Sequence, residues 1–396
     1  MIQISPETQL FIREHSSDDV RALALQAKKY PDIDMPTVIT QIAGRQVAAE
    51  KIPSWREIEE IWYPKHLSLE QCSSEITARY KARLFQGDSL TDLTGGFGID
   101  CSFLATGFKS ATYVERQEEL CEIAAHNFPI LNLNHINVRN EDGVAYLQTM
   151  SPVDCIFLDP ARRNEHGGKT VAISDCEPNV AELEALLLSK ANRVMIKLSP
   201  MLDLSLALKE LKHTQEIHIL SVNNECKELL ILLRQTSPAE IAIHCVNLLT
   251  KGTQEEQHLV FTREQEQRSQ CTYTDSLGNY LYEPNASLLK AGAFRSIAAA
   301  YPVRKLHPNS HLYISDSFIE NFPGRIFRIV NQCSFNKKEV KENLADLKKA
   351  NVTVRNFPAT VAELRKRLHL TEGGDTYLFA STLNNGQKVI IRCEKV

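Results

Sequence analysis

From about residue 88 onward, short apolar runs alternate with helical stretches, and this alternation constrains the fold more than any other feature of the chain. The expected strands are Ser89–Leu93, Ala111–Glu115, Ile136–Arg139, Asp154–Leu158, Arg193–Lys197, Ile217–Val222 and Leu229–Leu233. Strands separated by helices form βαβ units and a mainly parallel sheet. Only residues 223–228 separate the last two runs, which is too short for a helical crossover, so these two strands should run antiparallel. The sequence predicts an α/β fold with a seven-stranded sheet and an antiparallel strand late in the order.

The regions before and after this sheet have other sequence patterns and predict separate parts of the chain. Residues 1–84 carry apolar residues at helical spacing and predict a helical N-terminal domain. The α/β domain is expected at 85–275, with an added hairpin at about 241–263 and a polar connection at 264–280. A segment at 276–323 should contain a turn at Tyr282–Asn285 before an Ala-rich helix.

Residues 324–396 are predicted to form a small α+β domain of their own. The expected elements are strand Arg325–Val330, helix Lys337–Ala350, strand Val352–Asn356, helix Thr360–Leu368, and strands Tyr377–Ser381 and Lys388–Cys393. In both predicted helices the apolar residues fall on one face, which is typical of helices packed against a sheet.

Composition narrows the class of protein. Hydrophobic residues make up 43% and charged residues 24% of the 396 residues, a globular mix rather than a disordered one. The ten cysteines include no C-x-x-C pair, and Pro308 separates His307 from His311, so no metal site is expected. Neither a secretory signal nor an apolar stretch of about 20 residues is visible. We therefore expect a cytoplasmic protein that does not bind membranes.

The strongest local motif is a glycine-rich turn directly after the first expected strand. It reads Asp92-Leu93-Thr94-Gly95-Gly96-Phe97-Gly98-Ile99-Asp100. Glycines at the start of a helix let the backbone turn tightly and approach a ligand closely. Glu115 ends the next strand, where a carboxylate can accept hydrogen bonds from ribose hydroxyls. Both a dinucleotide and a nucleoside cofactor would use these residues.

An Asp-Pro turn after the fourth expected strand helps to distinguish between a dinucleotide and a nucleoside cofactor. Asp159-Pro160-Ala161-Arg162 follows the apolar run Cys155–Leu158. A proline here makes the loop rigid and places the Asp159 carboxylate at the carboxyl end of the sheet, over the ligand. A nicotinamide-dependent oxidoreductase, which could use the same glycine turn, is disfavoured by this feature.

Together these motifs resemble class I S-adenosylmethionine-dependent methyltransferases over residues 85–235. More closely, D-L-T-G-G-F-G-x-D, D-P-A-R-R and Lys197-Leu198-Ser199-Pro200 resemble bacterial members of that class with a ferredoxin-like segment at 276–323 and a THUMP-like C-terminal domain at 324–396. The sequences Arg355–Pro358 and Glu372–Ala380 resemble that C-terminal domain.

The resemblance implies S-adenosylmethionine as cofactor and a role for each matching residue. Thr94, Gly96 and Gly98 would shape the turn around the methionine part, with Gly95 and Asp100 also at the cofactor, and Asp92 would hold the amino group or nearby backbone. Glu115 would bind the ribose, Asp142 the adenine, and Asp159 would lie between cofactor and acceptor. The implied catalytic residues are Asp159, Pro160, Arg162 and Lys197. Thr94 replaces the first glycine of the class motif, and Ala161-Arg162 replaces a Pro-aromatic pair, which leaves the acceptor atom open.

The charge distribution points to the acceptor. Residues 324–396 contain 14 Lys and Arg against 7 Asp and Glu, whereas the whole chain has a formal charge of −4. A basic module on an acidic catalytic domain suggests docking of a polyanion. The expected phosphate contacts are Lys337, Lys338, Lys348, Lys349, Arg365, Lys366 and Arg367. THUMP domains are associated with RNA, so the resemblance implies tRNA or rRNA as substrate.

Other readings of the sequence stay open. The acceptor could be a protein or a small molecule, with the basic C-terminal helices only solvated. The chain could also bind RNA without catalysis, with a relic cofactor pocket. Residues 50–84, with Ser73–Glu75 and Thr77–Lys81, could provide a lid over the cofactor.

Overall fold

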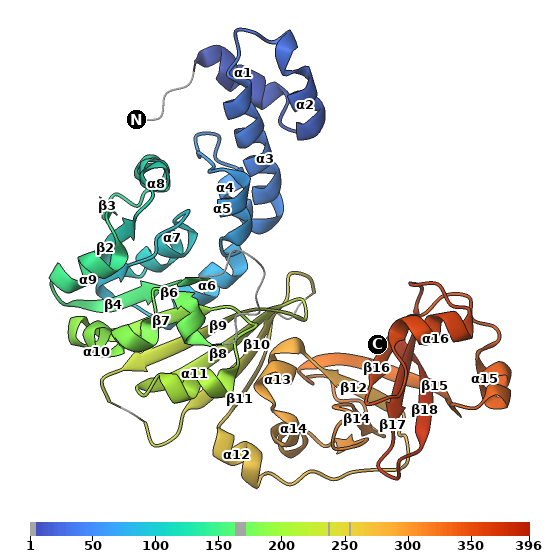
Figure 1. Ribbon diagram of the computed structural model, residues 1–396. Helices are drawn as coiled ribbons and strands as arrows, with labels where there is room; N and C mark the ends of the chain where they lie inside the picture. The colour runs from blue at the N-terminus through green and yellow to red at the C-terminus, as the bar shows by residue number, and fades with distance from the viewer. Residues whose placement is uncertain (1–4, 163–171, 237, 253–254) are drawn as a thin grey trace. The chain divides into compact units, whose positions relative to one another are not determined.

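The computed structural model describes residues 5–162, 172–236, 238–252 and 255–396 (Figure 1). The chain forms two compact units, Met1–Gln215 with Leu230–Ser237, and Glu216–Leu229 with Pro238–Val396. The division passes through two strands of one sheet and differs from the four predicted domains, whose boundaries remain a prediction.

The N-terminal region is helical, as expected. Its elements are α1 (Pro6–Glu14), α2 (Val20–Gln26), the 3₁₀ turn η1 (Ala27–Lys29), α3 (Met35–Lys51), α4 (Pro53–Arg56), α5 (His66–Gln71) and α6 (Glu75–Leu84). Side chains of Ser5, Asp19 and Asp34 cap the first turns of α1, α2 and α3. One apolar cluster joins α1, α2 and the start of α3. A second apolar cluster joins the end of α3 and α4–α6 to Phe97, Ile99 and Ile123. The helices α4–α6 therefore pack on the α/β domain.

The α/β domain follows directly. Its elements are β1 (Gly87–Asp92), α7 (Ile99–Ala105), β2 (Phe108–Glu115), α8 (Glu118–Ile130), β3 (Ile136–Asn140), α9 (Gly143–Thr149), β4 (Val153–Leu158), β5 (Ala161–Arg162), η2 (Ile173–Asp175), β6 (Cys176–Glu177), α10 (Val180–Lys190), β7 (Ala191–Leu198), α11 (Leu204–Glu210), β8 (Thr214–Val222), β9 (Glu225–Arg234), β10 (Ala242–Leu248) and β11 (Glu256–Phe261). The larger sheet has the order β11-β10-β8-β9-β7-β4-β1-β2-β3.

The strand order confirms the predicted α/β architecture. β1 pairs in parallel with both β2 and β4, and β4 pairs in parallel with β7. The chain runs outward from β1 to β3 and then returns to the other side of β1. In open α/β sheets, ligands bind at the carboxyl ends of strands where the order reverses in this way. The end of β1 and the end of β4 are therefore the expected place for a functional site.

The predicted strands correspond to β1–β4 and β7–β9. β8 and β9 are neighbours joined by Asn223 and Asn224, both with positive φ, which is the two-residue turn of an antiparallel hairpin. The added hairpin is also present, because β10 and β11 pair antiparallel. β10 pairs in parallel with β8, so the hairpin extends the same sheet.

A second sheet has the order β13-β14-β12-β15-β18-β17-β16. The remaining elements are α12 (Arg263–Arg268), β12 (Tyr280–Pro284), α13 (Ala286–Ala291), α14 (Phe294–Ala300), β13 (Arg304–Lys305), β14 (Tyr313–Ser315), β15 (Gly324–Ser334), α15 (Lys337–Leu344), β16 (Asn351–Arg355), α16 (Val361–Leu368), β17 (Thr376–Thr382) and β18 (Lys388–Lys395). β12 pairs antiparallel with β15, so the segments 276–323 and 324–396 contribute to one sheet.

Three local predictions in this region were wrong. The connection at 264–280 contains the helix α12, which begins at a capping box formed by Thr262 and Gln265. The expected turn at Tyr282–Asn285 is mostly the strand β12, because its side chains are buried between two neighbouring strands. The helix expected at Lys337–Ala350 ends at Leu344. Within the described ranges, no helix has both the length and the apolar character needed to cross a bilayer.

Candidate active site at the carboxyl ends of β1 and β4

The glycine turn links the end of β1 to the start of α7. Gly96 and Gly98 have φ values of +55° and +85°, and Gly98 is the N-cap of α7. Gly95 lies against a ring of β2, since a Cβ atom there would be 2.2 Å from Tyr113 Cε2. At Gly96 a Cβ atom would meet nothing closer than 3.8 Å among the described atoms. Gly95 is thus needed for packing, whereas the backbone at Gly96 faces open space.

Thr94 explains why the turn tolerates a departure from the glycine-rich motif. Its hydroxyl oxygen accepts a hydrogen bond from the Asp159 backbone N–H at 2.6 Å. A glycine at this position could not make this contact. Thr94 therefore ties the glycine turn to the Asp-Pro turn after β4, and Asp159 and Pro160 lie beside the glycine turn as predicted from the strand order.

Glu115 lies at the end of β2 and contacts the same turn. Its carboxylate accepts hydrogen bonds from the backbone N–H of Gly96 at 2.9 Å and of Gln117 at 2.8 Å. These two bonds fix the carboxylate at the rim of the turn. A carboxylate has about four lone-pair sites, so Glu115 keeps acceptor capacity for a ligand.

Asp142 has a structural role as the N-cap residue of α9. Its Oδ1 accepts hydrogen bonds from the N–H groups of Val144 and Ala145, each at 3.0 Å, and so caps α9. The next residue, Gly143, packs closely against Leu93, since a Cβ atom at Gly143 would be 2.1 Å from the Leu93 carbonyl oxygen. This packing brings Asp142 near the glycine turn. A role of Asp142 at an adenine ring remains a prediction.

Lys197, at the end of β7, joins three groups of the site. Its ammonium donates to Ser73 Oγ at 3.0 Å and to Asp100 Oδ2 at 3.2 Å, and it forms an ion pair with Asp159 Oδ2. The Lys197 side chain is 10% exposed and that of Asp159 is 36% exposed. The lysine is therefore largely enclosed, while the Asp159 carboxylate still reaches the surface.

A second lysine lies behind this contact and was not predicted as a site residue. Lys81, on α6, has a fully buried side chain whose ammonium lies 3.0 Å from Ser73 Oγ and 3.0 Å from Asp100 Oδ1. Ser73 Oγ also donates to Asp100 Oδ2 at 2.7 Å. The segment expected to provide a lid thus contributes Ser73 and Lys81 to the charged network. Their signal in the sequence is weak, because Asp100 and Lys197, the partners that they contact besides each other, lie 19–124 residues away along the chain.

The site is rich in carboxyl groups with shifted pKa values. Burial, followed by the charges of Asp100, Asp159 and Glu115, raises the pKa of Asp92 to about 8, against the effect of the Thr94 N–H. Burial also acts on Asp100, but Lys81 and Lys197 outweigh it and lower its pKa. For Asp159, burial raises the pKa and the Lys197 ammonium opposes the shift. Among the described residues, the charges that act on Asp92 are carboxylates, whereas Asp100 has two lysines beside it.

Two groups of predicted residues are not among the described members of this network. The backbone of Arg162 pairs with Cys176, but its side chain lies outside the described part of the chain. The seven predicted phosphate-binding residues all lie in the second unit. Six of them are exposed, and Arg365 is partly buried in an ion pair with Glu372.

Comparisons with known proteins agree with this architecture. Family models match a ferredoxin-like domain at residues 280–323 and a THUMP domain-like region at residues 324–395. The comparison with curated proteins gave no match. A crystal structure from Porphyromonas gingivalis W83, of a protein that carries the provisional name methyltransferase, is 34% identical, with full coverage of both chains and a TM-score of 0.87.

Two more distant structures share only part of the chain. An rRNA methylase from Streptococcus thermophilus is 13% identical over 40% of this chain and 94% of its own, with a TM-score of 0.31. M. capricolum TrmK, solved with S-adenosyl-homocysteine, is 12% identical over 41% of this chain and 68% of its own, with a TM-score of 0.32. These two are too dissimilar to support an argument. The identity over the full length of the first structure, together with the two domain matches, shows that the chain belongs to the bacterial class I methyltransferases with a ferredoxin-like segment and a THUMP-like C-terminal domain.

Proposed function

We propose that this protein transfers the methyl group of S-adenosylmethionine to a nucleotide in structured RNA, either tRNA or rRNA. The observation that carries the proposal is the cluster at the ends of β1, β2, β4 and β7. There the glycine turn, Glu115 and the Asp159–Lys197 pair lie within hydrogen-bonding reach of one another or of a shared neighbour.

The electrostatics of the site favour a cationic cofactor. Burial, and then the charges of three neighbouring carboxyl groups, raise the pKa of Asp92, while both lysines of the network contact Asp100. S-adenosylmethionine carries a sulfonium and an ammonium group, which would compensate the carboxyl groups on the Asp92 side. In this proposal Asp92 faces the ammonium, Glu115 binds the ribose hydroxyls, and Asp142 binds the adenine amino group. Gly96 provides the open backbone against which the cofactor lies.

When bound, S-adenosylmethionine supplies a methyl group that is already activated for transfer. A bond forms between the acceptor atom and the methyl carbon while the carbon–sulfur bond breaks, and a nitrogen acceptor loses a proton. What remains for the protein is to place the acceptor in line. Asp159 lies at the partly exposed edge of the network, and the raised pKa of its carboxyl suits a proton acceptor. Lys197 holds that carboxylate in place.

Support for RNA comes from the second unit, which is described here by itself. Lys337 and Lys338 begin α15, Lys348 and Lys349 precede β16, and Lys366 and Arg367 end α16. All six are exposed, and they belong to a region with an excess of seven positive charges. Exposed lysines of this kind bind phosphates without reading sequence. The match to a THUMP domain-like model supports the same conclusion.

The test is methyl transfer from radiolabelled S-adenosylmethionine to total RNA from a strain that lacks the gene. We expect label in RNA with the wild-type protein and a large loss with Asp159→Asn. The matched control is Asp154→Asn, which changes an acid at the other end of β4, hydrogen-bonded to the N–H groups of Asp88 and Ser89. If wild-type protein binds the cofactor but labels no RNA, the RNA acceptor is wrong.

A second set of variants tests the basic residues. Deletion of residues 324–396 is unsuitable, because β15 pairs with β12 and the deletion would expose that strand. Replacing the six exposed basic residues by Gln leaves the strand pairing of this region in place, and it should weaken RNA binding and reduce its dependence on salt. Unchanged RNA binding and RNA methylation by this variant would mean that RNA docks through another surface.

A further inference from the structure

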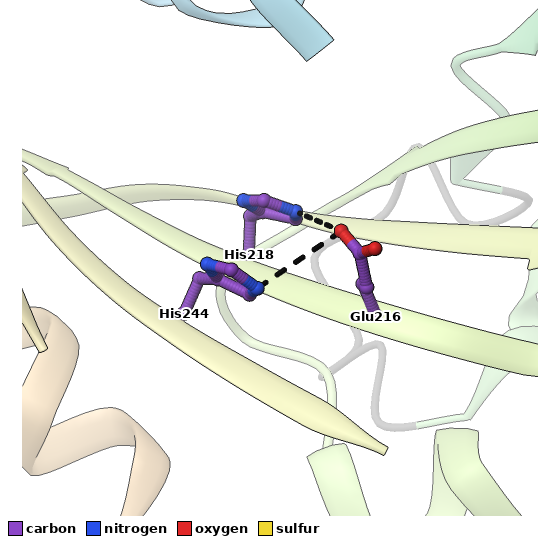
Figure 2. Close-up of side chains that lie close together, drawn as sticks. All are labelled: Glu216, His218 and His244. Atoms are coloured by element: carbon purple, nitrogen blue, oxygen red, sulfur yellow. Dashed lines mark hydrogen bonds and ion pairs between the residues drawn. The ribbon is translucent and has the colours of Figure 1, made fainter. Parts of the chain in front are cut away.

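Outside the candidate active site, three polar side chains converge on one face of the large sheet. Glu216 and His218 are two residues apart on β8, so they point to the same face, and His244 on β10 is the register partner of His218 (Figure 2). All three belong to the second unit. The sequence separates His218 from His244 by 26 residues, and for this reason no metal-site spacing was visible in it.

The three side chains present one ligand atom each to a common point. His218 Nε2 lies 3.3 Å and His244 Nε2 lies 3.9 Å from the same atom, Glu216 Oε2. The two imidazole rings are stacked, with centroids 4.3 Å apart and planes inclined by 13°. One nitrogen or oxygen atom from each of the three residues falls within 4.8 Å of the others. These separations are close to those between neighbouring ligands of one small cation, with metal–ligand bonds of about 2.0–2.2 Å.

A third histidine contacts the ring of His244 on the side away from Glu216. His244 Nδ1 lies 3.2 Å from Nε2 of His258 on β11, and this contact needs one hydrogen. If His244 carries its hydrogen on Nδ1 and donates it to His258, Nε2 turns a lone pair toward the Glu216 carboxylate. Such a lone pair is a metal ligand, and a ring hydrogen bond on the other nitrogen is the usual way to fix a ligating histidine.

The donor set selects the kind of ion. Two imidazole nitrogens and one carboxylate oxygen suit Zn²⁺ and similar first-row divalent ions, whereas Mg²⁺ and Ca²⁺ prefer oxygen ligands. The Glu216 side chain is 39% exposed, so an ion can enter from that side, while His218 is 2% exposed and held by the sheet. We propose that Glu216, His218 and His244 form a binding site for one Zn²⁺ ion, with His258 orienting His244.

Such an ion would join β8 to β10 through side chains as well as through the backbone ladder. The site would therefore act on the stability of the second unit, and its function is independent of the methyl transfer proposed above. It also departs from the prediction that the chain has no metal site.

The experiment titrates untagged, full-length protein with Zn²⁺ in competition with a chromophoric chelator, and separately with Co²⁺ and Mg²⁺. We expect one Zn²⁺ per chain, visible absorption bands of four-coordinate Co²⁺, and no competition by Mg²⁺. Thermal unfolding should shift upward by about 5 °C or more at a free Zn²⁺ concentration 100-fold above the Kd.

Variants assign the site. His244→Gln and Glu216→Gln should remove the Zn²⁺ equivalent, and His258→Ala should weaken binding about 10–100-fold while keeping the stoichiometry. His213→Gln is the matched control, because His213 also contacts a glutamate, with Nδ1 3.2 Å from Glu184 Oε1, and does not belong to the three residues whose ligand atoms converge. Glu216 is half-exposed, so its variant should fold even if a change at buried His218 does not. Failure of the wild-type protein to bind Zn²⁺, or wild-type binding by both Gln variants at positions 216 and 244, would overturn the proposal.

Discussion

Replacing Lys81 by Met tests whether the buried charges behind the active site act as one network. The ammonium of Lys81 is fully buried and lies 3.0 Å from both Ser73 Oγ and Asp100 Oδ1. Methionine has a similar length and no charge. Lys81→Met therefore keeps most of the packing of α6 against α7 but leaves Asp100 with Lys197 as its one remaining ion-pair partner among the described residues.

The expected cost follows from this geometry. Removing one member of a buried ion pair costs about 3–5 kcal/mol, because the other charge loses its compensation. Here Lys197 still compensates part of the Asp100 charge, so we expect a value near the lower end, about 3 kcal/mol. Changing Asp100→Asn as well removes the uncompensated charge. The double variant should thus be more stable than the sum of the single effects predicts, with a coupling energy of about 1.5 kcal/mol or more.

The assay is urea unfolding followed by tryptophan fluorescence. Both tryptophans of the chain, Trp55 and Trp62, pack in or against the apolar cluster that joins the N-terminal helices to the α/β domain. Their fluorescence therefore reports the unfolding of the first unit without a contribution from the second. With an m-value of about 2–3 kcal/mol/M, Lys81→Met should lower the midpoint by about 1 M or more.

Arg79→Met provides the control on the same helix, since the Arg79 side chain is 59% exposed in its ion pair with Glu75 and should contribute less than about 1 kcal/mol. A midpoint for Lys81→Met equal to that of Arg79→Met, with additive effects of Lys81→Met and Asp100→Asn, would refute the network.

Three further predictions concern the cofactor side of the site. The affinity for S-adenosylmethionine should increase as the pH rises toward 8, because a cationic ligand requires ionised Asp92 and burial raises the pKa of this carboxyl to about 8. Calorimetry in buffers of different ionisation enthalpy should show proton release on binding. A pH profile of affinity that Asp92→Asn leaves unchanged would contradict this role of Asp92. Gly95→Ala should weaken cofactor binding at least 10-fold, measured by equilibrium dialysis, because the new Cβ atom would lie 2.2 Å from the buried ring of Tyr113; wild-type affinity would show that the turn need not keep this position. Thr94→Val should lower the stability of the first unit by about 1–3 kcal/mol in the same fluorescence assay, because the Asp159 N–H loses its acceptor, whereas Thr94→Ser should not.

The parts of the fold that the sequence predicted well are those where burial imposes a simple pattern. β4 and β7 have buried apolar runs, and β1 and β2 are buried toward their carboxyl ends, so the existence and the parallel order of these strands could be inferred. The helix that begins at Lys337 was predicted to end at Ala350, because Leu347 continues the apolar spacing of Leu344, and it ends at Leu344. The pairing of β12 with β15 could not be inferred, since it joins strands about 40 residues apart through a segment with little periodic pattern.

In the candidate site, too, some residues could be predicted from the sequence and others could not. Asp92, Glu115 and Lys197 lie at the carboxyl ends of β1, β2 and β7, and Asp159 directly follows β4. Their meeting at one edge of the sheet is a consequence of strand order. Ser73 precedes α6 and Lys81 lies on it, and nothing in their local sequence shows that α6 packs on α7. Thr94 appeared as a departure from a motif, yet its hydroxyl has a contact that glycine could not make.

The most direct test of the central claim is a comparison of modified nucleosides in cellular RNA. RNA from a strain lacking the gene, and from the same strain supplied with wild-type protein or with Asp159→Asn, is digested and its nucleosides are compared by mass spectrometry. The account predicts one methylated nucleoside that disappears in the gene-deletion strain, returns with the wild-type protein and does not return with Asp159→Asn. Identical nucleoside profiles in all three strains, with the wild-type protein expressed and folded, would contradict RNA methylation by this protein.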